Sequence, residues 1–137
     1  MQRIILDTNV IVSSLIQKNY PYLIVAHCIE GNAIMCLSGP ILQEYIEVLG
    51  RPKFDRFPDF KANADFLITR LSEMSETHEP IAKLKIVEDE PDNWFLELAQ
   101  VSKADFIITG NTNDFTMVTY ETTRIVTPRE YWEECKQ

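Results

Sequence analysis

The chain has 137 residues, of which 45% are hydrophobic, a composition typical of an ordinary globular protein. A chain of this length buries roughly two thirds of the surface that it exposes when unfolded, so we expect one domain over residues 1–137. No apolar run approaches the ~20 residues needed to span a bilayer, and the N-terminus lacks a basic region followed by an apolar core. The sequence therefore predicts a cytoplasmic protein without a membrane segment.

The formal net charge of −8 is unevenly distributed along the chain. Residues 1–70 hold seven basic and seven acidic side chains, whereas residues 71–137 hold six basic and fourteen acidic ones. Nonspecific binding of nucleic acid relies on Lys and Arg that neutralise phosphates, and this acidic half opposes it. The charge is better suited to divalent cations or to a basic partner.

Cysteine and histidine give little support to redox, zinc or histidine-dependent chemistry. Cys28, Cys36 and Cys135 are odd in number, widely spaced and without a C-x-x-C pair, which argues against a disulfide framework and a zinc site. We expect buried thiols, at least for the first two. His27 and His78 are isolated in the sequence, so a structural or solvated position is expected for each.

The first half of the chain alternates short strands with helices. Continuous apolar runs at residues 3–6 and 33–37 predict two strands that are buried on both faces. The sequence also predicts helices at residues 10–16, 22–30, 40–50 and 58–75, the second of them closed by Gly31.

The second half continues the alternation. Apolar runs predict strands at residues 84–87, 106–109 and 124–126, with a helix over residues 93–103. The segment Thr127-Pro128-Arg129-Glu130 has the pattern of a capping box and predicts a last helix. Strands that alternate with helices indicate a parallel sheet between helical layers. We therefore expect an α/β fold, a three-layer α/β/α sandwich around a mostly parallel sheet of about five strands.

The first strand ends abruptly on Asp7, Thr8 and Asn9. In open parallel sheets, ligands bind beyond the carboxyl ends of the strands, so Asp7 is a candidate for an active-site residue. An alternative is that Asp7 or Thr8 only caps the following helix. The loop at residues 109–114, which follows the fourth strand, should share this edge, whereas Asp105 should lie at the opposite one.

Helical periodicity selects two further acids. Glu44 flanks the apolar face of its helix and can reach inward, whereas Glu47 points nearly opposite. Asp92 lies one turn above a buried stripe, whereas Asp89 and Glu97 are rotated away from it. Glu44 as an ordinary boundary residue and Asp92 as a helix-capping acid remain alternatives.

Acids from four elements are thereby brought to one edge of the sheet: Asp7, Glu44, Asp92 and Asp114. Clustered carboxylates repel one another, and a divalent cation resolves this conflict. Oxygen ligands without His or Cys select Mg²⁺ or Mn²⁺. The amides of Asn9 and Asn111 lie nearby in the predicted arrangement.

The order and spacing of five segments resemble the PIN domain, and specifically the VapC-like toxin nucleases. These segments are Leu6-Asp7-Thr8-Asn9-Val10, Ser38-x-Pro40-x-Leu42-x-Glu44, Asp92-Asn93-x-Phe95-Leu96-x-Leu98-Ala99, Ala104-Asp105-Phe106-Ile107-Ile108-Thr109-Gly110-Asn111 and Asp114-Phe115. The resemblance implies a metal-dependent ribonuclease in which Asp7, Glu44 and Asp92 are the acidic triad and Asp114 is a fourth ligand. It also implies an antitoxin partner, and a homodimer is an assembly to be tested.

In the implied mechanism, Asn9, Thr109 and Asn111 orient ligands or waters around the metal. Many relatives have an acid directly after the Thr-Gly pair, where this chain has Asn111. Other relatives place Asn there with an acid three residues later, as Asn111 and Asp114 do. The assignment of Asp114 as the fourth ligand therefore follows only one of the two patterns found among relatives.

The one basic concentration in the chain is a candidate surface for RNA. It contains Arg51 and Lys53, with Arg56 and Lys61 further on, and is interrupted by two acids. A solvated loop is the alternative. Phe54 and Phe57, which lie between the basic residues, are expected in the core rather than stacked on bases.

Two other functions fit parts of the sequence. An aspartyl phosphatase or phosphotransferase would use Asp7 as a nucleophile, but such enzymes commonly place a second Asp where this chain has Asn9. A non-catalytic module that binds protein or RNA would keep the scaffold, although the intact acids Asp7, Glu44 and Asp92 weigh against it.

Overall fold

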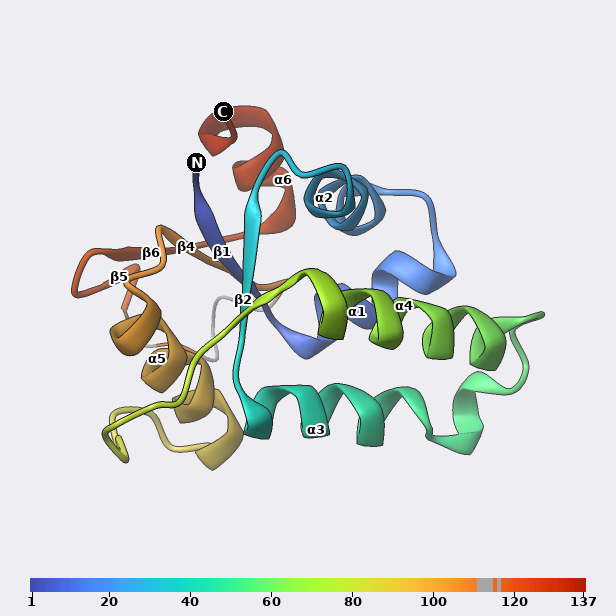
Figure 1. Cartoon of the computed structure of the whole chain (residues 1–137), viewed down its shortest axis with the longest axis horizontal. Helices are drawn as coiled ribbons and strands as arrows, with labels where there is room; N and C mark the ends of the chain where they lie inside the picture. Colours follow the sequence, from blue (N-terminus) through green and yellow to red (C-terminus); the bar gives the residue numbers. More distant parts are fainter. Residues whose placement is uncertain (111–114, 116) are drawn as a thin grey trace.

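The computed structural model (Figure 1) describes residues 1–110, 115 and 117–137. Its sheet has the strand order β3-β2-β1-β4-β6-β5. The strands are β1 Arg3–Leu6, β2 Ile34–Leu37, β3 Glu76–Thr77, β4 Phe106–Ile108, β5 Thr119–Tyr120 and β6 Thr123–Val126. Every pairing is parallel except that of β5 with β6, so the predicted, mostly parallel sheet is confirmed.

Helices cover both faces of this sheet. They are α1 Thr8–Ile16, α2 Tyr20–Ile29, α3 Gly39–Leu49, α4 Phe60–Met74, α5 Glu90–Ser102 and α6 Pro128–Glu130, with the short helical turns Pro52–Phe54 and Tyr131–Cys135. In Figure 1, α5 lies on one side of the sheet and α1, α2 and α4 lie on the other, which confirms the three-layer sandwich. Among the described residues, no helix has the length and apolar character to cross a bilayer.

The central strands form the core. Ile4, Ile5 and Leu6 are fully buried, as the continuous apolar run predicts for a strand covered on both faces. Gly31 follows Glu30, the C-cap residue of α2, and has a φ of +85°, a conformation that favours glycine and ends the helix as expected. The capping box at Thr127 and Glu130 is confirmed, since each side chain accepts a hydrogen bond from the other residue's backbone amide.

The prediction of a strand at residues 84–87 was wrong. The third strand is instead β3, and residues 84–87 form a loop whose amides bind side chains of α5. Leu84 donates to the Glu97 carboxylate at 3.0 Å, and both Ile86 and Val87 donate to Asn93 Oδ1. Glu97 is therefore buried at 8% exposure, which contradicts its predicted outward orientation.

The thiols and the isolated histidines lie close to expectation. Cys28 and Cys36 are buried, and Cys135 is half-buried. His27 is buried against the Trp132 ring at a centroid distance of 5.5 Å, which fits a structural role. His78 is half-buried beside β3.

Candidate active site at the carboxyl edge of the sheet

Asp7 occupies the junction between β1 and α1. It holds the N-cap position of α1, but its side chain makes no capping hydrogen bond. Instead, Asp7 Oδ2 accepts a hydrogen bond of 2.7 Å from Thr109 Oγ1, which follows β4. Asp7 is only 7% exposed and Thr109 is fully buried. The side chain thus joins the carboxyl ends of two neighbouring strands, as expected for a parallel sheet.

Glu44 reaches the same edge from α3. The buried Thr8 hydroxyl, next to Asp7, donates a hydrogen bond to the Glu44 carboxylate. Glu47, one turn further on, is exposed and forms an ion pair with Arg51 at 3.0 Å. The inward position of Glu44 and the outward position of Glu47 are both as the helical periodicity predicts.

Tyr45 of α3 is a further part of this edge, one that the sequence analysis did not single out. It is fully buried, and its hydroxyl donates to the backbone carbonyl of Leu6. Burial raises the pKa of Tyr45 well above its ordinary value, and the negative charges of Asp7 and Glu44 raise it further. Both charges therefore act on the same phenol, and the hydrogen bond of this phenol fixes α3 to the end of β1.

Asp92 lies in the first turn of α5 and is half-buried. The C-terminal end of α5 at Ser102 leads directly into β4, so that end lies near the amino ends of the strands. The N-terminal turn, about 20 Å away along the helix, is therefore directed to the carboxyl edge, and α5 also contacts α3. The meeting of the Asp92 carboxylate with Asp7 and Glu44 stays a prediction.

The other predicted residues divide into three groups. Asn9 is exposed on α1. Asn111 and Asp114 lie outside the described residues. Asp105 accepts a hydrogen bond of 2.8 Å from the Arg3 amide, at the start of β1, which confirms its place at the opposite edge.

The basic segment follows the far end of α3. Arg51 pairs with Glu47, and Lys53 Nζ lies 5.2 Å from the centroid of the Phe54 ring. The length of α3, about 16 Å, separates these cations from the start of the helix at the sheet edge. Phe54 is buried and stacks on Phe60 with a centroid distance of 4.8 Å, so its predicted core position is confirmed.

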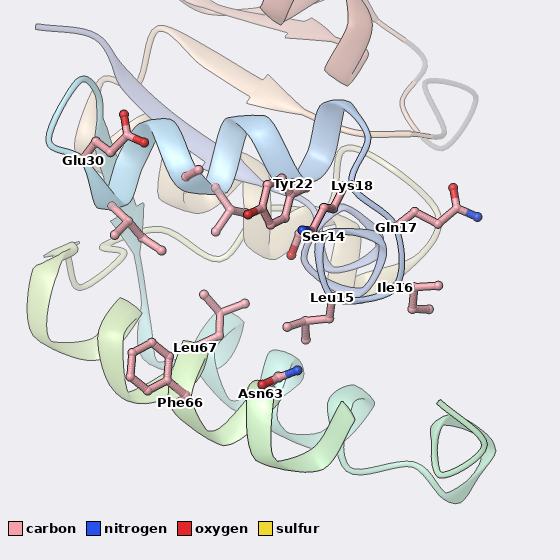
Figure 2. A pocket seen from close by; sticks show the side chains of 13 residues that line it. Ser14, Leu15, Ile16, Gln17, Lys18, Tyr22, Glu30, Asn63, Phe66 and Leu67 are labelled. Carbon is pink, nitrogen blue, oxygen red and sulfur yellow. The ribbon is translucent and has the colours of Figure 1, made fainter. Parts of the chain in front are cut away.

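An apolar groove lies between α1, α2 and α4, as Figure 2 shows. Its volume is about 450 Å³, and Leu15, Ile16 and Leu67 contribute to its walls. Phe66 is 72% exposed and Tyr22 40% exposed at this groove. Exposed aromatic side chains around an apolar hollow are typical of a surface that binds another protein.

The chain is similar in sequence and fold to known proteins. A sequence model of the PIN domain matches residues 3–113. The chain is 28% identical to an uncharacterised protein of Methanocaldococcus jannaschii, MJ1680, over 141 residues that cover 96% of this chain and 90% of that protein.

The fold also resembles that of VapBC2 from Rickettsia felis, solved with a DNA fragment from its promoter. The match has a TM-score of 0.59 at 13% identity and covers 92% of this chain and 98% of the other. At this identity the likeness concerns the fold alone, which agrees with the family match. The chain belongs to the PIN domain family.

Proposed function

We propose that residues 1–137 form a single metal-dependent ribonuclease domain that hydrolyses phosphodiester bonds of single-stranded RNA. The observation that carries this proposal is the pair of carboxylates at the carboxyl edge. Asp7 from the end of β1 and Glu44 from α3 are each held by a threonine hydroxyl, in a chain of the PIN domain family. Asp92 and Asp114 complete the proposed acidic set.

The residues of this edge fit a hard divalent cation. The proposed ligands Asp7, Glu44, Asp92 and Asp114 offer only carboxylate oxygen, which favours Mg²⁺ or Mn²⁺ over softer metals. Asp7 and Glu44 both raise the pKa of the buried Tyr45, which supports a negative edge. When bound, a divalent cation supplies an activated water and neutralises charge on the phosphate.

The chain's own residues set the geometry for this chemistry. Thr109 fixes one oxygen of Asp7, and Thr8 fixes one oxygen of Glu44. Tyr45 holds α3 against β1, so that the two carboxylates keep their relative positions. We propose that Asn9 and Asn111 orient waters there and that Arg51 and Lys53 bind the RNA backbone at a distance from the cleaved bond.

A matched pair of substitutions on α3 tests the proposal. Glu44→Gln should abolish cleavage of a single-stranded RNA in Mg²⁺ or Mn²⁺, whereas Glu47→Gln, which removes an exposed charge one turn away, should retain it. Excess chelator should stop the wild-type protein, and added Mg²⁺ should restore it. Equal activity of Glu44→Gln and wild type, or cleavage that continues in chelator, would show that the site is wrongly assigned.

We further propose that the protein is the cytoplasmic toxin of a toxin–antitoxin pair. VapBC2 of Rickettsia felis was solved with a DNA fragment from its promoter, and its fold is similar to that of this chain. The groove between α1, α2 and α4 is the surface on which we place an antitoxin segment, with a basic side chain that extends to the acidic edge. A homodimer is an additional assembly within this proposal.

Co-expression with the product of the neighbouring gene tests the partner. Phe66→Glu should leave RNA cleavage unchanged but prevent neutralisation of toxicity, because it places a charge at the apolar groove. Ile81→Glu, at a residue 89% exposed elsewhere on the chain, is the control and should still be neutralised. If expression causes no toxicity and no neighbour binds, while the purified protein cleaves RNA, the proposal reduces to a stand-alone nuclease.

A further inference from the structure

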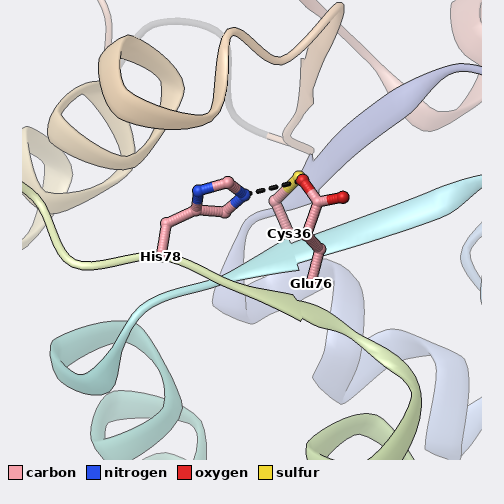
Figure 3. A group of neighbouring side chains, drawn as sticks. All are labelled: Cys36, Glu76 and His78. Atoms are coloured by element: carbon pink, nitrogen blue, oxygen red, sulfur yellow. Dashed lines mark hydrogen bonds and ion pairs between the residues drawn. The ribbon is translucent and has the colours of Figure 1, made fainter.

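Donors of three kinds gather at the β2–β3 side of the sheet. Cys36 of β2 pairs in register with Glu76 of β3, and His78 follows Glu76 by two residues. Because side chains alternate between the two faces of a strand, all three lie on one face of the sheet. Figure 3 shows them converging, and a sulfur, an imidazole nitrogen and a carboxylate oxygen lie within 4.8 Å of one another.

Cys36 lies at the closed end of this cluster. It is fully buried, and burial raises the pKa of its thiol to about 11, so the thiol keeps its proton at neutral pH. The hydroxyl of Ser102, at the end of α5, neighbours the thiol and opposes this rise. Ser102 is only 6% exposed, and its oxygen lacks a well-formed hydrogen bond in the described part of the chain. A thiolate in this position would give that hydroxyl an acceptor.

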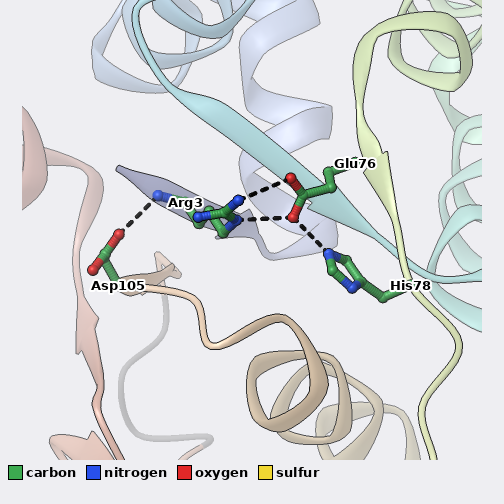
Figure 4. A network of polar contacts seen from close by, with 4 residues as sticks. All are labelled: Arg3, Glu76, His78 and Asp105. Carbon is green, nitrogen blue, oxygen red and sulfur yellow. Dashed lines mark hydrogen bonds and ion pairs between the residues drawn. The ribbon is translucent and has the colours of Figure 1, made fainter. Parts of the chain in front are cut away.

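Glu76 and His78 lie at the open end. Their side chains are 33% and 22% exposed, and His78 Nε2 lies 2.7 Å from Glu76 Oε1. Arg3 binds the same carboxylate from β1, with Nε 2.8 Å from Oε1 and Nη2 3.2 Å from Oε2, as Figure 4 shows. Hydrogen bonds from Arg3 and then from His78 lower the pKa of Glu76, so the carboxylate is ionised at neutral pH.

We propose that Cys36, Glu76 and His78 form a second metal site, for Zn²⁺ or a cation of similar softness, in which the ion takes the position between His78 and Glu76. Thiolate, imidazole and carboxylate are each zinc ligands, and three protein ligands with one water complete a tetrahedral site, distinct from the all-oxygen set at the carboxyl edge. Ligand atoms around a tetrahedral zinc are roughly 3.3–3.8 Å apart, so side-chain shifts of about 1 Å close the site.

The binding step balances without any oxidant. The Cys36 thiol releases its proton to solvent as the Zn–S bond forms, and His78 presents its Nε2 lone pair while its proton lies on Nδ1. Arg3 gives up at least one carboxylate oxygen, and its side chain, 42% exposed, can turn into solvent. The bound ion would attach β3, a strand of two residues at the end of the sheet, to its neighbour β2.

The cysteine spacing predicts no zinc site, because no two cysteines lie close together in the sequence. Here the donors come from neighbouring strands, far apart in the chain, so spacing rules do not detect them. The proposal does not depend on ribonuclease activity, since none of its three donors belongs to the carboxyl edge.

Cadmium gives a direct test on the full chain after treatment with chelator. Cd²⁺ should produce a thiolate-to-metal absorption band in the ultraviolet that saturates at one equivalent, and Zn²⁺ should remove the band by competition and raise the melting temperature. Cys36→Ser should abolish the band, and His78→Gln should weaken binding about tenfold or more. Cys135→Ser and Asp7→Asn, which change a different thiol and the carboxyl edge, should keep it.

Arg3→Gln gives the opposite sign. Because it removes a cation that competes for Glu76, it should tighten Zn²⁺ binding severalfold, whereas loss of a ligand weakens it. The proposal is overturned if wild-type protein gives no band, if the band survives in Cys36→Ser, or if Arg3→Gln binds Zn²⁺ no more tightly than wild type. Should Cys36→Ser fail to fold, unchanged affinity of His78→Gln also overturns it.

Discussion

Carboxylates in two regions of the same sheet are held by different kinds of donor. At the carboxyl edge, Asp7 and Glu44 accept hydrogen bonds from the hydroxyls of Thr109 and Thr8. At the β2–β3 side, Glu76 is bound by the Arg3 guanidinium and the His78 ring. A hydroxyl fixes the direction of a carboxylate but leaves its charge in place. A guanidinium fixes the direction and also neutralises the charge.

The effects on nearby groups follow this difference. The charges of Asp7 and Glu44 are not compensated by a cation in these hydrogen bonds, and they raise the pKa of the buried Tyr45. The charge of Glu76 is compensated, and its own pKa is lowered chiefly by Arg3. The first arrangement maintains a negative edge suited to a hard cation, and the second is a balanced network that a metal can enter only by competition.

The largest expected effect is on catalysis at the carboxyl edge. Asp7→Asn should reduce RNA cleavage by about 100-fold or more, because it removes the charge of a buried ligand while keeping the shape of the side chain. Glu76→Gln, in the balanced network, should leave cleavage close to wild type. Rate measurements on both purified variants decide whether the two regions differ in function.

Asp7→Asn should also fold at least as well as wild type without metal. Removal of one charge relieves repulsion with Glu44 and the other acids of the edge. Urea denaturation in chelator measures this, and a large loss of stability would instead assign Asp7 a structural role.

The next effect concerns the hydroxyl that orients Asp7. Thr109→Val removes the hydroxyl that donates to the buried Asp7 carboxylate and should cost about 1–3 kcal/mol in the free energy of unfolding. Since orienting partners of metal ligands typically contribute 10–100-fold, cleavage should fall by about that factor.

Thr123→Val is the matched control for this hydroxyl. Thr123 is 1% exposed and donates to the Ala104 carbonyl at 2.6 Å, near the opposite edge of the sheet. It should lose comparable stability but keep its cleavage rate. If both variants lose activity equally, the effect of Thr109→Val is one of stability alone.

Much of the carboxyl edge followed from local patterns. The first strand has the predicted bounds, because the apolar residues Ile4, Ile5 and Leu6 follow Arg3 and are stopped by polar residues. The opposite directions of Glu44 and Glu47 followed from the helical period, since α3 has a well-defined buried face. These properties depend on neighbours within one or two turns, which a single sequence contains.

There is a physical reason why the β2–β3 side could not be predicted from the sequence. β3 has two residues, too few for a period, and it pairs with β2 through contacts far apart in the chain. The run at residues 84–87 has the apolar character of a strand, but Asn93 and Glu97 bind its amides and hold it as a loop. Glu97 was placed outside because its partner is a backbone amide of that loop, which periodicity does not reveal.

The addition of Mg²⁺ should have an effect of intermediate size, and it should distinguish the two regions. Mg²⁺ should raise the melting temperature of the wild type by neutralising the acidic edge, because an ion that binds only the folded chain stabilises it. Asp7→Asn should lose this response, whereas Cys36→Ser should keep it, since Mg²⁺ prefers oxygen ligands. A Mg²⁺ response that survives Asp7→Asn would place the bound cation elsewhere.

The smallest expected effect is the acid dependence of the balanced network. The ordinary pKa of Glu76 is 4.5 and its folded value is lowered, so its contribution to stability is fully present above pH 4.5 and is lost as the pH falls through the lower folded value. The stability difference between wild type and Glu76→Gln, measured by urea denaturation in chelator, should therefore shrink as the pH falls below 4.5. Because the side chains of Arg3 and Glu76 are 42% and 33% exposed, added salt should reduce this difference.

Glu79→Gln is the control, because it removes an exposed acid three residues away and should follow the wild-type profile. If it shows the same pH dependence as Glu76→Gln, the effect comes from net charge rather than from the contact with Arg3.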